Sequence, residues 1–167
     1  PDDGYPHQNL SGVAVAFKLA CALSGDTEAV LDSYADMVCL GTVADVIPLV
    51  GENRDFVSRG LQSLSSTRRP GLAALIEECG CAKNDISAST IGFMLAPRIN
   101  AAGRMGQVDV AVDLFLTQDP ERARADAAQL CELNRQRQQI ESDIYRQAIA
   151  MLPEGTPPEA IVLADES

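Results

Sequence analysis

The stretch from Asp119 to about residue 152 constrains the fold of this chain more than any other. Asp119-Pro120-Glu121 combines an N-cap residue, a proline at the first helical position and an acid in the first turn, which together strongly indicate a helix start. Apolar residues then recur at steps of three and four, with Arg137 interrupting the seam: Leu130, Leu133, Ile140, Ile144, Ala148 and Met151. This spacing predicts a long connecting helix over 119–152 that packs along one side, and the short, broken seam disfavours a free coiled coil.

The rest of the chain also favours helices. Hydrophobic residues make up 46% of the sequence but aromatic residues only 4%, so the core must consist mostly of aliphatic side chains. Good capping or first-turn residues precede each apolar segment: Asn9 or Ser11, Asp26, Asn53 or Arg54, Pro70, and Asn84 or Asp85. Pro97 is expected to end the last of these helices, which makes 95–106 an ordered loop. Residues 160–164 read as a buried strand.

Charge restricts how such a chain can bind nucleic acid. Its formal net charge is −11, whereas a domain that binds DNA by itself is normally basic on at least one face. One window, between Asp85 and Asp109, contains no acidic residue and carries Arg98 and Arg104. Binding to a phosphate backbone is therefore expected only at a local positive site.

The cysteines and the single histidine do not suggest a catalytic centre. Five cysteines without a Cys-x-x-Cys pair are typical of reduced thiols in a cytoplasmic protein, and a metal or redox role for the close pair Cys79 and Cys81 is disfavoured. His7 is expected to be a solvated loop residue. The sequence contains no apolar run of the roughly 18 residues that a membrane span needs.

Asp45 is the one carboxylate in the apolar stretch 38–50. A charge on the edge of a core needs compensation, and two kinds are open. The carboxylate could accept a main-chain N–H at the bend into Pro48, or it could bind a hard cation such as Mg²⁺ or Mn²⁺. Asp36 lies nine residues earlier and would face the opposite side of a helix, so it is a poor partner for one metal ion.

Residues 98–106 contain the second candidate site. Small residues at 101–103 let the backbone approach another molecule closely, and Arg104 follows with a guanidinium group suited to phosphate oxygens. A helix start near Asp109 would add free N–H groups. From the residues alone, an anion site and a helix–helix corner with two solvated arginines both remain open.

Three stretches carry a resemblance to a known family: 8–17, 40–54 and 95–106. They read Gln-Asn-Leu-Ser-Gly-Val-Ala-Val-Ala-Phe, then Leu-Gly-Thr-Val-Ala-Asp-Val-Ile-Pro-Leu with Gly51-Glu52-Asn53-Arg54, and Leu-Ala-Pro-Arg-Ile-Asn-Ala-Ala-Gly-Arg-Met-Gly. In this order they resemble the DHH phosphoesterases, and most of all the RecJ-like exonucleases that degrade single-stranded DNA from 5′ to 3′.

The resemblance implies a fold that is mainly α in this chain and part of a larger two-domain α/β enzyme with a long connecting helix. Residues 1–53 would be the C-terminal helical part of the catalytic domain. Residues 54–155 would be the helical connector, including 95–106 and the helix 119–152. Residues 156–167 would hold the first strand of the second domain. The Asp-x-Asp and Asp-His-His motifs would precede Pro1, and a Gly-Gly-His loop would follow Ser167.

The resemblance also implies a function in DNA repair and recombination. Asp45 would be a ligand to Mn²⁺ or Mg²⁺. Arg98, Asn100 and Arg104 would lie near the cleft and bind single-stranded DNA, and Arg104 would hold its 5′-terminal phosphate. DNA-repair proteins are possible partners, and no membrane is involved. Since one carboxylate cannot complete the metal site, the 167-residue chain alone is expected to be inactive. The alternatives are another DHH phosphoesterase acting on short oligonucleotides or cyclic dinucleotides, and a non-catalytic helical interaction module.

Overall fold

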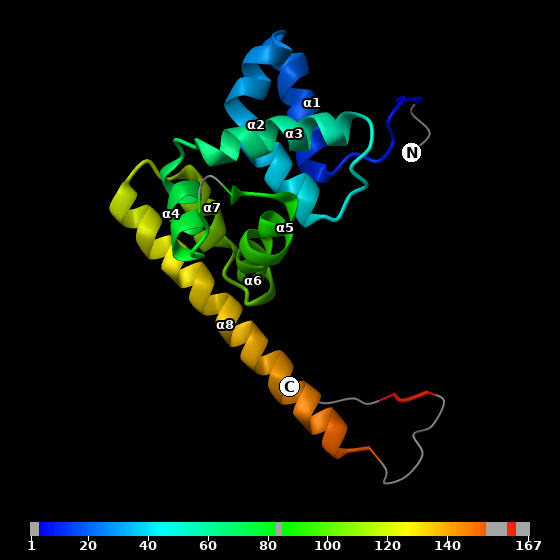
Figure 1. Cartoon of the computed structure of the whole chain (residues 1–167), viewed down its shortest axis with the longest axis vertical. Coiled ribbons are helices and arrows are strands. Elements are labelled where there is room, and N and C mark those ends of the chain that lie inside the picture. The colour runs from blue at the N-terminus through cyan, green and yellow to red at the C-terminus, as the bar shows by residue number, and fades with distance from the viewer. Residues whose placement is uncertain (1–3, 83–84, 153–159, 163–167) are drawn as a thin grey trace.

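A computed structural model describes residues 4–82, 85–152 and 160–162. The described residues form helices joined by short turns (Figure 1), and they include no strand. In chain order the elements are α1 (Gly12–Ser24), α2 (Thr27–Ala44), α3 (Glu52–Ser65), α4 (Pro70–Glu78), α5 (Ala88–Thr90), the π-helical turn η2 (Ile91–Leu95), α6 (Ala96–Arg104), α7 (Val108–Leu116) and α8 (Pro120–Ala150). The expectation of a mainly α chain is confirmed. None of the described helices is long and apolar enough to cross a lipid bilayer.

Most of the helix starts follow from local capping. Ser11 accepts the Ala14 N–H at 3.3 Å and caps α1. Asp26 accepts the N–H of Ala29 at 3.0 Å and caps α2. Asp119 accepts the N–H of Glu121 at 2.9 Å and caps α8. These three caps agree with the sequence-based prediction, because an N-cap acts only on its own first turn.

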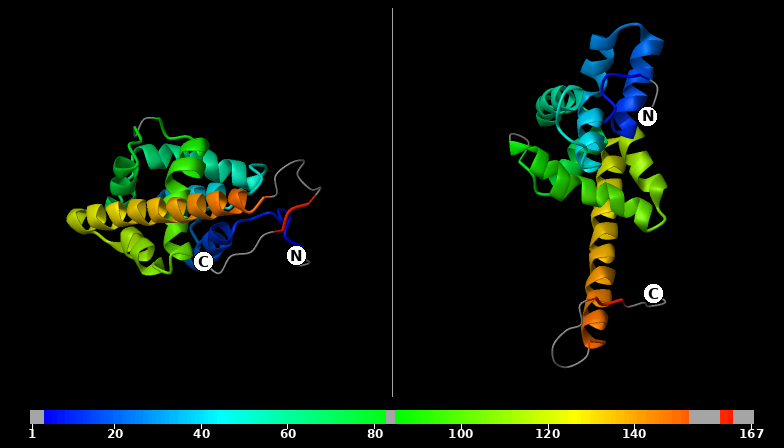
Figure 2. Two further views of the ribbon diagram at one scale, coloured as in Figure 1. Left: turned by 90° about the horizontal axis from the view of Figure 1, so that it is seen from below. Right: turned by 90° about the vertical axis from the view of Figure 1, so that its right-hand side faces the viewer.

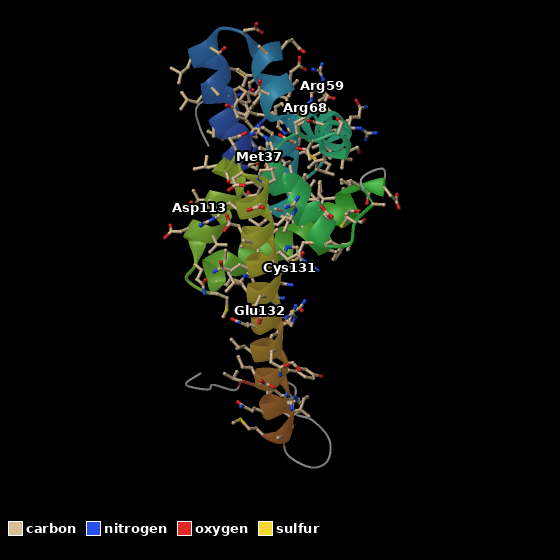
Figure 3. The ribbon with its side chains drawn as sticks, turned by 90° about the vertical axis from the view of Figure 1, so that its left-hand side faces the viewer. Met37, Arg59, Arg68, Asp113, Cys131 and Glu132 are labelled. Atoms are coloured by element: carbon tan, nitrogen blue, oxygen red, sulfur yellow. The ribbon has the colours of Figure 1, made fainter. Side chains whose placement is uncertain are left out.

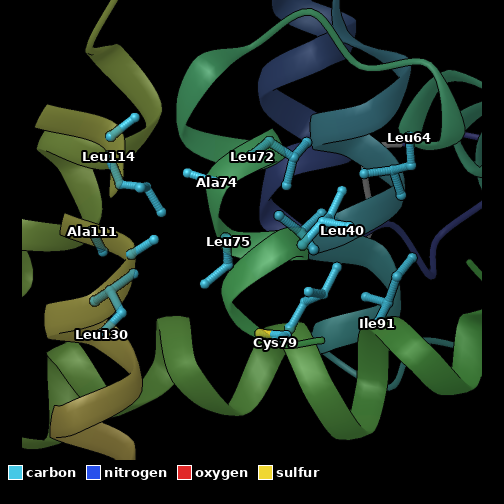
Figure 4. Packing of buried hydrophobic residues seen from close by; sticks show 14 of the residues in the cluster. Leu40, Leu64, Leu72, Ala74, Leu75, Cys79, Ile91, Ala111, Leu114 and Leu130 are labelled. Atoms are coloured by element: carbon cyan, nitrogen blue, oxygen red, sulfur yellow. The ribbon is translucent and has the colours of Figure 1, made fainter. Parts of the chain in front are cut away.

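Two apolar clusters make up the core, and α2 contributes to both. The first joins α1, α2 and α3, with the Phe17 and Phe56 rings packed edge to face at 5.2 Å. The second is larger and gathers the end of α2 with α3, α4, η2, α6, α7 and α8 (Figure 4). Close packing needs glycine at two points: a Cβ at Gly60 would lie 2.4 Å from the Ala35 carbonyl oxygen, and one at Gly71 would lie 1.7 Å from that of Leu114.

The long helix is present, but only half of it is packed. Its first half buries Ala123, Ala127, Leu130 and Leu133, whereas its second half extends away from the other helices (Figures 1 and 2). The predicted seam continues there, with Ile140 46% and Ile144 40% exposed. The helix is therefore confirmed at nearly the expected bounds. Among the described residues, however, the expected packing along one side holds only for its first half.

The expected loop at 95–106 is wrong, because this segment is helical. The chain continues from α5 through η2 into α6, and Pro97 lies in the first turn of α6 rather than after a helix. In a continuous α-helix the proline ring would clash with a carbonyl of the preceding turn. The π-turn before it shifts the register, since the N–H of Ala96 bonds to Ile91, and the helix passes the proline without ending. The cap of this segment is Ser87 rather than Asn84 or Asp85.

The expected strand at 160–164 is not found in its described residues. Residues 160–162 have no regular secondary structure, and the remaining two residues lie outside the described residues. His7 also differs from expectation. Its ring packs 3.1 Å from the point where a Cβ at Gly51 would lie, and its Nε2 is buried. The N-terminal segment is thus in contact with the turn that precedes α3.

Candidate functional site

Asp45 lies at the carboxyl end of α2, where the helix gives way to an irregular segment. Its main-chain N–H donates to the Gly41 carbonyl at 3.0 Å, and the next two N–H groups donate to the carbonyls of Val43 and Thr42 at 3.1 and 3.3 Å. These bonds form a Schellman motif, which requires the residue after the cap to adopt the left-handed conformation. That residue is Val46, with φ 55°, at a position where glycine is usual.

The turn after Asp45 is held in place although its backbone is strained. A side chain in the left-handed conformation costs roughly 1–2 kcal/mol, and Val46 is 87% exposed, so its own burial offers little compensation. The buried Asn53 fixes the turn from the other side. Its Nδ2 donates to the carbonyl of Pro48 at 3.1 Å and to that of Asn9 at 2.6 Å. Asp45 is therefore presented by a well-defined backbone.

The Asp45 side chain itself is exposed. Within the part of the chain that the structure describes, its carboxylate makes no hydrogen bond or ion pair. The alternative in which it accepts an N–H of its own turn is therefore not seen. An exposed carboxylate without a counter-charge fits the oxygen-ligand preference of Mg²⁺ or Mn²⁺.

The helix α6 presents Asn100 and Arg104 on one face. The two residues are four positions apart, so their side chains lie on the same side of the helix, and both are exposed. In the described residues neither makes a side-chain hydrogen bond or ion pair. Ala101 and Ala102 lie between them in sequence and are buried in the core. The small residues that were expected to let a ligand approach instead anchor α6, with only Gly103 on the exposed side.

Arg98 lies on a different face of the same helix. It precedes Asn100 by two positions, which is a rotation of about 200° in an α-helix. Its Nη1 donates to the Met94 carbonyl at 2.5 Å, and its Nε is buried without a hydrogen bond. Burial raises the pKa of the Cys79 and Cys81 thiols, and the nearby guanidinium group of Arg98 opposes this effect. Arg98 thus satisfies a carbonyl at the π-turn in addition to carrying charge.

The end of α2 is adjacent to the segment that leads into α6. Val43, two residues before Asp45, places its Cγ1 3.9 Å from where a Cβ at Gly92 would lie, and Figure 1 shows this end of α2 next to α5. The two parts of the candidate site, Asp45 and the exposed face of α6, are therefore carried by helices in direct contact.

The N-terminus of α7 follows Arg104 closely. The cap residue Gln107 makes no capping hydrogen bond with its side chain, because that side chain accepts a bond from Gln129 at 2.9 Å. The Val110 N–H donates to the main-chain carbonyl of Gln107 at 3.2 Å, but the cap side chain satisfies none of the first N–H groups of α7. Free N–H groups at a helix start favour anions. Asp109 in the first turn opposes a second negative charge. Arg104 is also in the last turn of α6, where a cation is favourable for the helix itself.

Sequence comparison identifies the relatives of this chain. The single-stranded-DNA-specific exonuclease RecJ of Bacillus subtilis is 42% identical over 165 residues, which cover 98% of this chain and 21% of that protein. The chain is homologous to a portion of RecJ. RecJ of Escherichia coli is 36% identical over 163 residues, covering 90% of this chain and 28% of that RecJ. No family model matches the chain.

Solved RecJ structures share the fold. The crystal structure of Thermus thermophilus RecJ in complex with Mn²⁺ matches with a TM-score of 0.67 at 38% identity, over 72% of this chain and 18% of that one. A structure of the exonuclease RecJ bound to manganese matches with a TM-score of 0.68 at 38% identity, over 73% of this chain and 31% of that one. A RecJ structure in complex with Mg²⁺ matches as well. The chain spans less than a third of the RecJ chains it matches.

A hard metal ion such as Mn²⁺ or Mg²⁺ needs several oxygen ligands. Among the described residues, no three His, Cys, Asp or Glu side chains gather in a way that could hold a metal ion. Asp45 is an exposed hard-oxygen donor on a turn held by main-chain hydrogen bonds. One carboxylate can contribute to the coordination of Mn²⁺ or Mg²⁺ but cannot complete it.

Two buried acids are explained by arginine partners that the sequence analysis did not identify. Asp36 is only 4% exposed and binds the Nε of Arg69 at 3.1 Å. Asp126 is 3% exposed and binds Arg122 at 2.9 Å. The second pair has i, i+4 spacing on a helix, a signal that was available in the sequence. The first joins residues 33 positions apart, and no local pattern indicates it.

Proposed function

We propose that this chain forms part of a metal-dependent exonuclease that hydrolyses single-stranded DNA from its 5′ end, as the homologous RecJ proteins imply. The observation that supports the proposal is the environment of the Asp45 carboxylate. The side chain is exposed and has no partner among the described residues. It lies on a turn whose strained backbone is held by Asn53, in a chain of which 98% aligns with RecJ.

Asp45 would hold the cation from one side. When bound, Mn²⁺ or Mg²⁺ would supply an activated water and polarise the phosphoryl oxygen. The remaining ligands would come from parts of RecJ that this chain does not align with. The Schellman motif keeps the carboxylate at the end of α2 without using any of its oxygens. Both oxygens therefore remain available for coordination.

Arg104 and Asn100 would bind the 5′-terminal phosphate. Their shared exposed face offers a guanidinium fork and an amide, and the N-terminus of α7 adds main-chain N–H groups. Arg98 would contribute positive charge from the neighbouring face while its Nη1 holds the Met94 carbonyl. In a chain with a net charge of −11, these cations would provide a local site on a surface that otherwise repels DNA.

The division of the chain follows the same proposal. Residues 1–53 would complete the catalytic domain, 54–155 would form the connector with 95–106 and 119–152 inside it, and 156–167 would begin the second domain. The free cysteines suit the reducing cytoplasm, where the enzyme would act in DNA repair and recombination. Other repair proteins would be its partners.

Asp45→Asn in the full-length protein tests the metal role. The substitution keeps the size of the side chain but removes its charge, so hydrolysis of a single-stranded oligonucleotide should fall by at least about a hundredfold. Asp32→Asn is the matched control, because Asp32 is an exposed acid on the same helix. Turnover by the Asp45 variant close to that of the control would remove Asp45 from the site.

Arg104→Ala tests the phosphate role. Rates are measured on one oligonucleotide with a 5′-phosphate and on the same oligonucleotide with a 5′-hydroxyl. The preference for the phosphorylated end should drop by roughly tenfold, since a charge-assisted hydrogen bond contributes about 1.5–3 kcal/mol. Arg124→Ala, at another exposed arginine, should leave the preference unchanged. Equal losses on both substrates would indicate that Arg104 supports the fold instead.

A further inference from the structure

Phe93 is an aromatic side chain that the fold leaves outside the core. Of the four phenylalanines in the chain, Phe17 and Phe56 are buried against each other and Phe115 is half-buried. Phe93 is 81% exposed. Because an aromatic ring stabilises a fold mainly through the apolar surface that it buries, Phe93 contributes little to the packing among the described residues.

The π-turn η2 holds the backbone of Phe93 in place. Ile91 and Leu95, two residues away on either side, are fully buried in the larger core, and Figure 4 shows Ile91 there. The carbonyl of Met94 accepts a hydrogen bond from the Nη1 of Arg98 at 2.5 Å. The ring is therefore presented to solvent from a packed and hydrogen-bonded turn, and such π-turns are frequent at functional sites.

The same segment joins the two parts of the candidate site. The residue before the phenylalanine, Gly92, lies against α2: a Cβ placed there would be 3.9 Å from the Cγ1 of Val43, two residues before Asp45. In the other direction the helix continues into α6, whose exposed side carries Arg104. Residues 86–108 include no acidic side chain, so a phosphate backbone that follows this helix meets no carboxylate from it.

We propose that Phe93 stacks on a nucleobase of the single-stranded DNA whose 5′-terminal phosphate lies at Arg104, an inference that rests on the proposed nuclease function. Every base has a π-face, so stacking on a phenyl ring accepts any sequence. Stacking also needs no positive charge, which suits a chain with a net charge of −11. Bases that are paired and stacked within a duplex are not free to contact the ring, so Phe93 would favour single strands.

The dissociation constant of the full-length protein for a 5′-phosphorylated oligonucleotide tests this role. Fluorescence anisotropy measures it in the absence of divalent ions, so that the DNA stays intact. In a series of otherwise identical oligonucleotides, one base at a time is removed while the sugar–phosphate backbone is kept. The wild type should bind roughly tenfold more weakly when the base that stacks on Phe93 is missing, and this position should lie near the 5′ end.

Phe93→Leu keeps an apolar side chain but removes the π-face. This variant should bind the intact oligonucleotide roughly tenfold more weakly, and removal of the stacked base should then have no further effect. Phe93→Tyr should restore both properties to within about twofold of the wild type. Tyr145→Leu is the matched control, because Tyr145 is an exposed aromatic residue on the second half of α8, beyond Glu132 (Figure 3). It should behave like the wild type.

Two results would overturn the stacking role. One is a Phe93→Leu variant that binds every oligonucleotide as the wild type does. The other is an equal loss of affinity for intact DNA and for every abasic oligonucleotide. If the midpoint of urea unfolding falls with it, the ring packs against another part of the full-length protein. The nuclease proposal is judged separately, because a wild type that neither binds nor hydrolyses single-stranded DNA would refute it, whereas either result above leaves it intact.

Discussion

Asp36 and Asp45 lie on the same helix and are used in opposite ways. Asp36 is buried, and its oxygens accept from Arg69, from Thr67 and from the N–H of Met37. Asp45 is exposed, and among the described residues it is bonded only through its main chain. The difference shows how the chain divides its charges. The carboxylate that stabilises the fold has its partners within the chain, whereas the carboxylate without a partner among the described residues stays exposed to solvent.

Asp36→Ala is the strongest test of whether Asp36, unlike Asp45, stabilises the fold. The change removes the counter-charge of Arg69, whose side chain is only 29% exposed. We expect the free energy of unfolding to fall by about 3 kcal/mol, near the lower end for a broken buried ion pair. Urea unfolding followed by circular dichroism measures it, with Asp32→Ala on the same helix as the control. A loss below about 1 kcal/mol would mean that Asp36 is not a structural acid.

Asn53→Ala tests the support of the Asp45 turn. Asn53 is fully buried and donates to the carbonyls of Asn9 and Pro48. Its removal takes a donor from both carbonyls, although that of Pro48 keeps the Val50 N–H. The expected destabilisation is about 2 kcal/mol. The same urea experiment measures it, and the exposed Asn100→Ala should change stability by less than about 0.5 kcal/mol. Equal effects at the two positions would show that the turn does not depend on Asn53.

Glu52→Gln tests a carboxylate whose exposure lies between that of Asp36 and that of Asp45. Glu52 is about one-third exposed and pairs with Lys18, and Tyr5 donates to it at 2.8 Å. Burial alone would raise its pKa, but the hydrogen bonds from Lys18 and Tyr5 outweigh burial and lower it from 4.5. A lowered pKa stabilises the fold above pH 4.5, and this stability is lost as the pH falls through the native value.

The wild type should therefore exceed Glu52→Gln in stability at pH 7, and the difference should vanish on acidification below about pH 4.5. Because solvent screens the pair, we expect only about 0.5 kcal/mol at neutral pH. Unfolding midpoints of both proteins at a series of pH values measure the difference. A gap that stays constant into acid would exclude ionisation of Glu52 as its source.

The smallest expected effect is that of Asp45→Ala on folding. Since its carboxylate bonds to none of the described residues, the free energy of unfolding should change by less than about 0.5 kcal/mol. Thermal or urea unfolding of the two proteins compares them directly. A loss like that of Asp36→Ala would remove the distinction between the two acids.

Much of the fold could be predicted because its signals are local. Ser11, Asp26 and Asp119 each cap the turn that they begin, and the 31 residues of α8 follow from its start signal and its apolar spacing. Pro97 shows the limit of such reasoning. A proline ends an α-helix, but a π-turn just before it removes the clash. No residue pattern in 91–95 distinguishes a π-turn from an α-helical one.

Local signals also indicate the residues of the candidate site, whose roles stay predictions. Asp45 was found as the one charge in an apolar stretch, and its exposure agrees with a role outside the fold. A predicted loop at 95–106 does not separate Arg98 from Asn100 and Arg104, because only helical geometry places them on different faces. The pairing of Asp36 with Arg69 depends on the tertiary contact between α2 and the turn before α4, and no local pattern predicts it.

Val46 has a practical consequence for protein engineering. A library selected only for heat resistance should enrich glycine at this position, since glycine adopts the same backbone without steric penalty. A library selected for DNA degradation by the full-length enzyme need not do so. Sequencing both populations would show whether valine at this position matters for the stability of the fold or for activity.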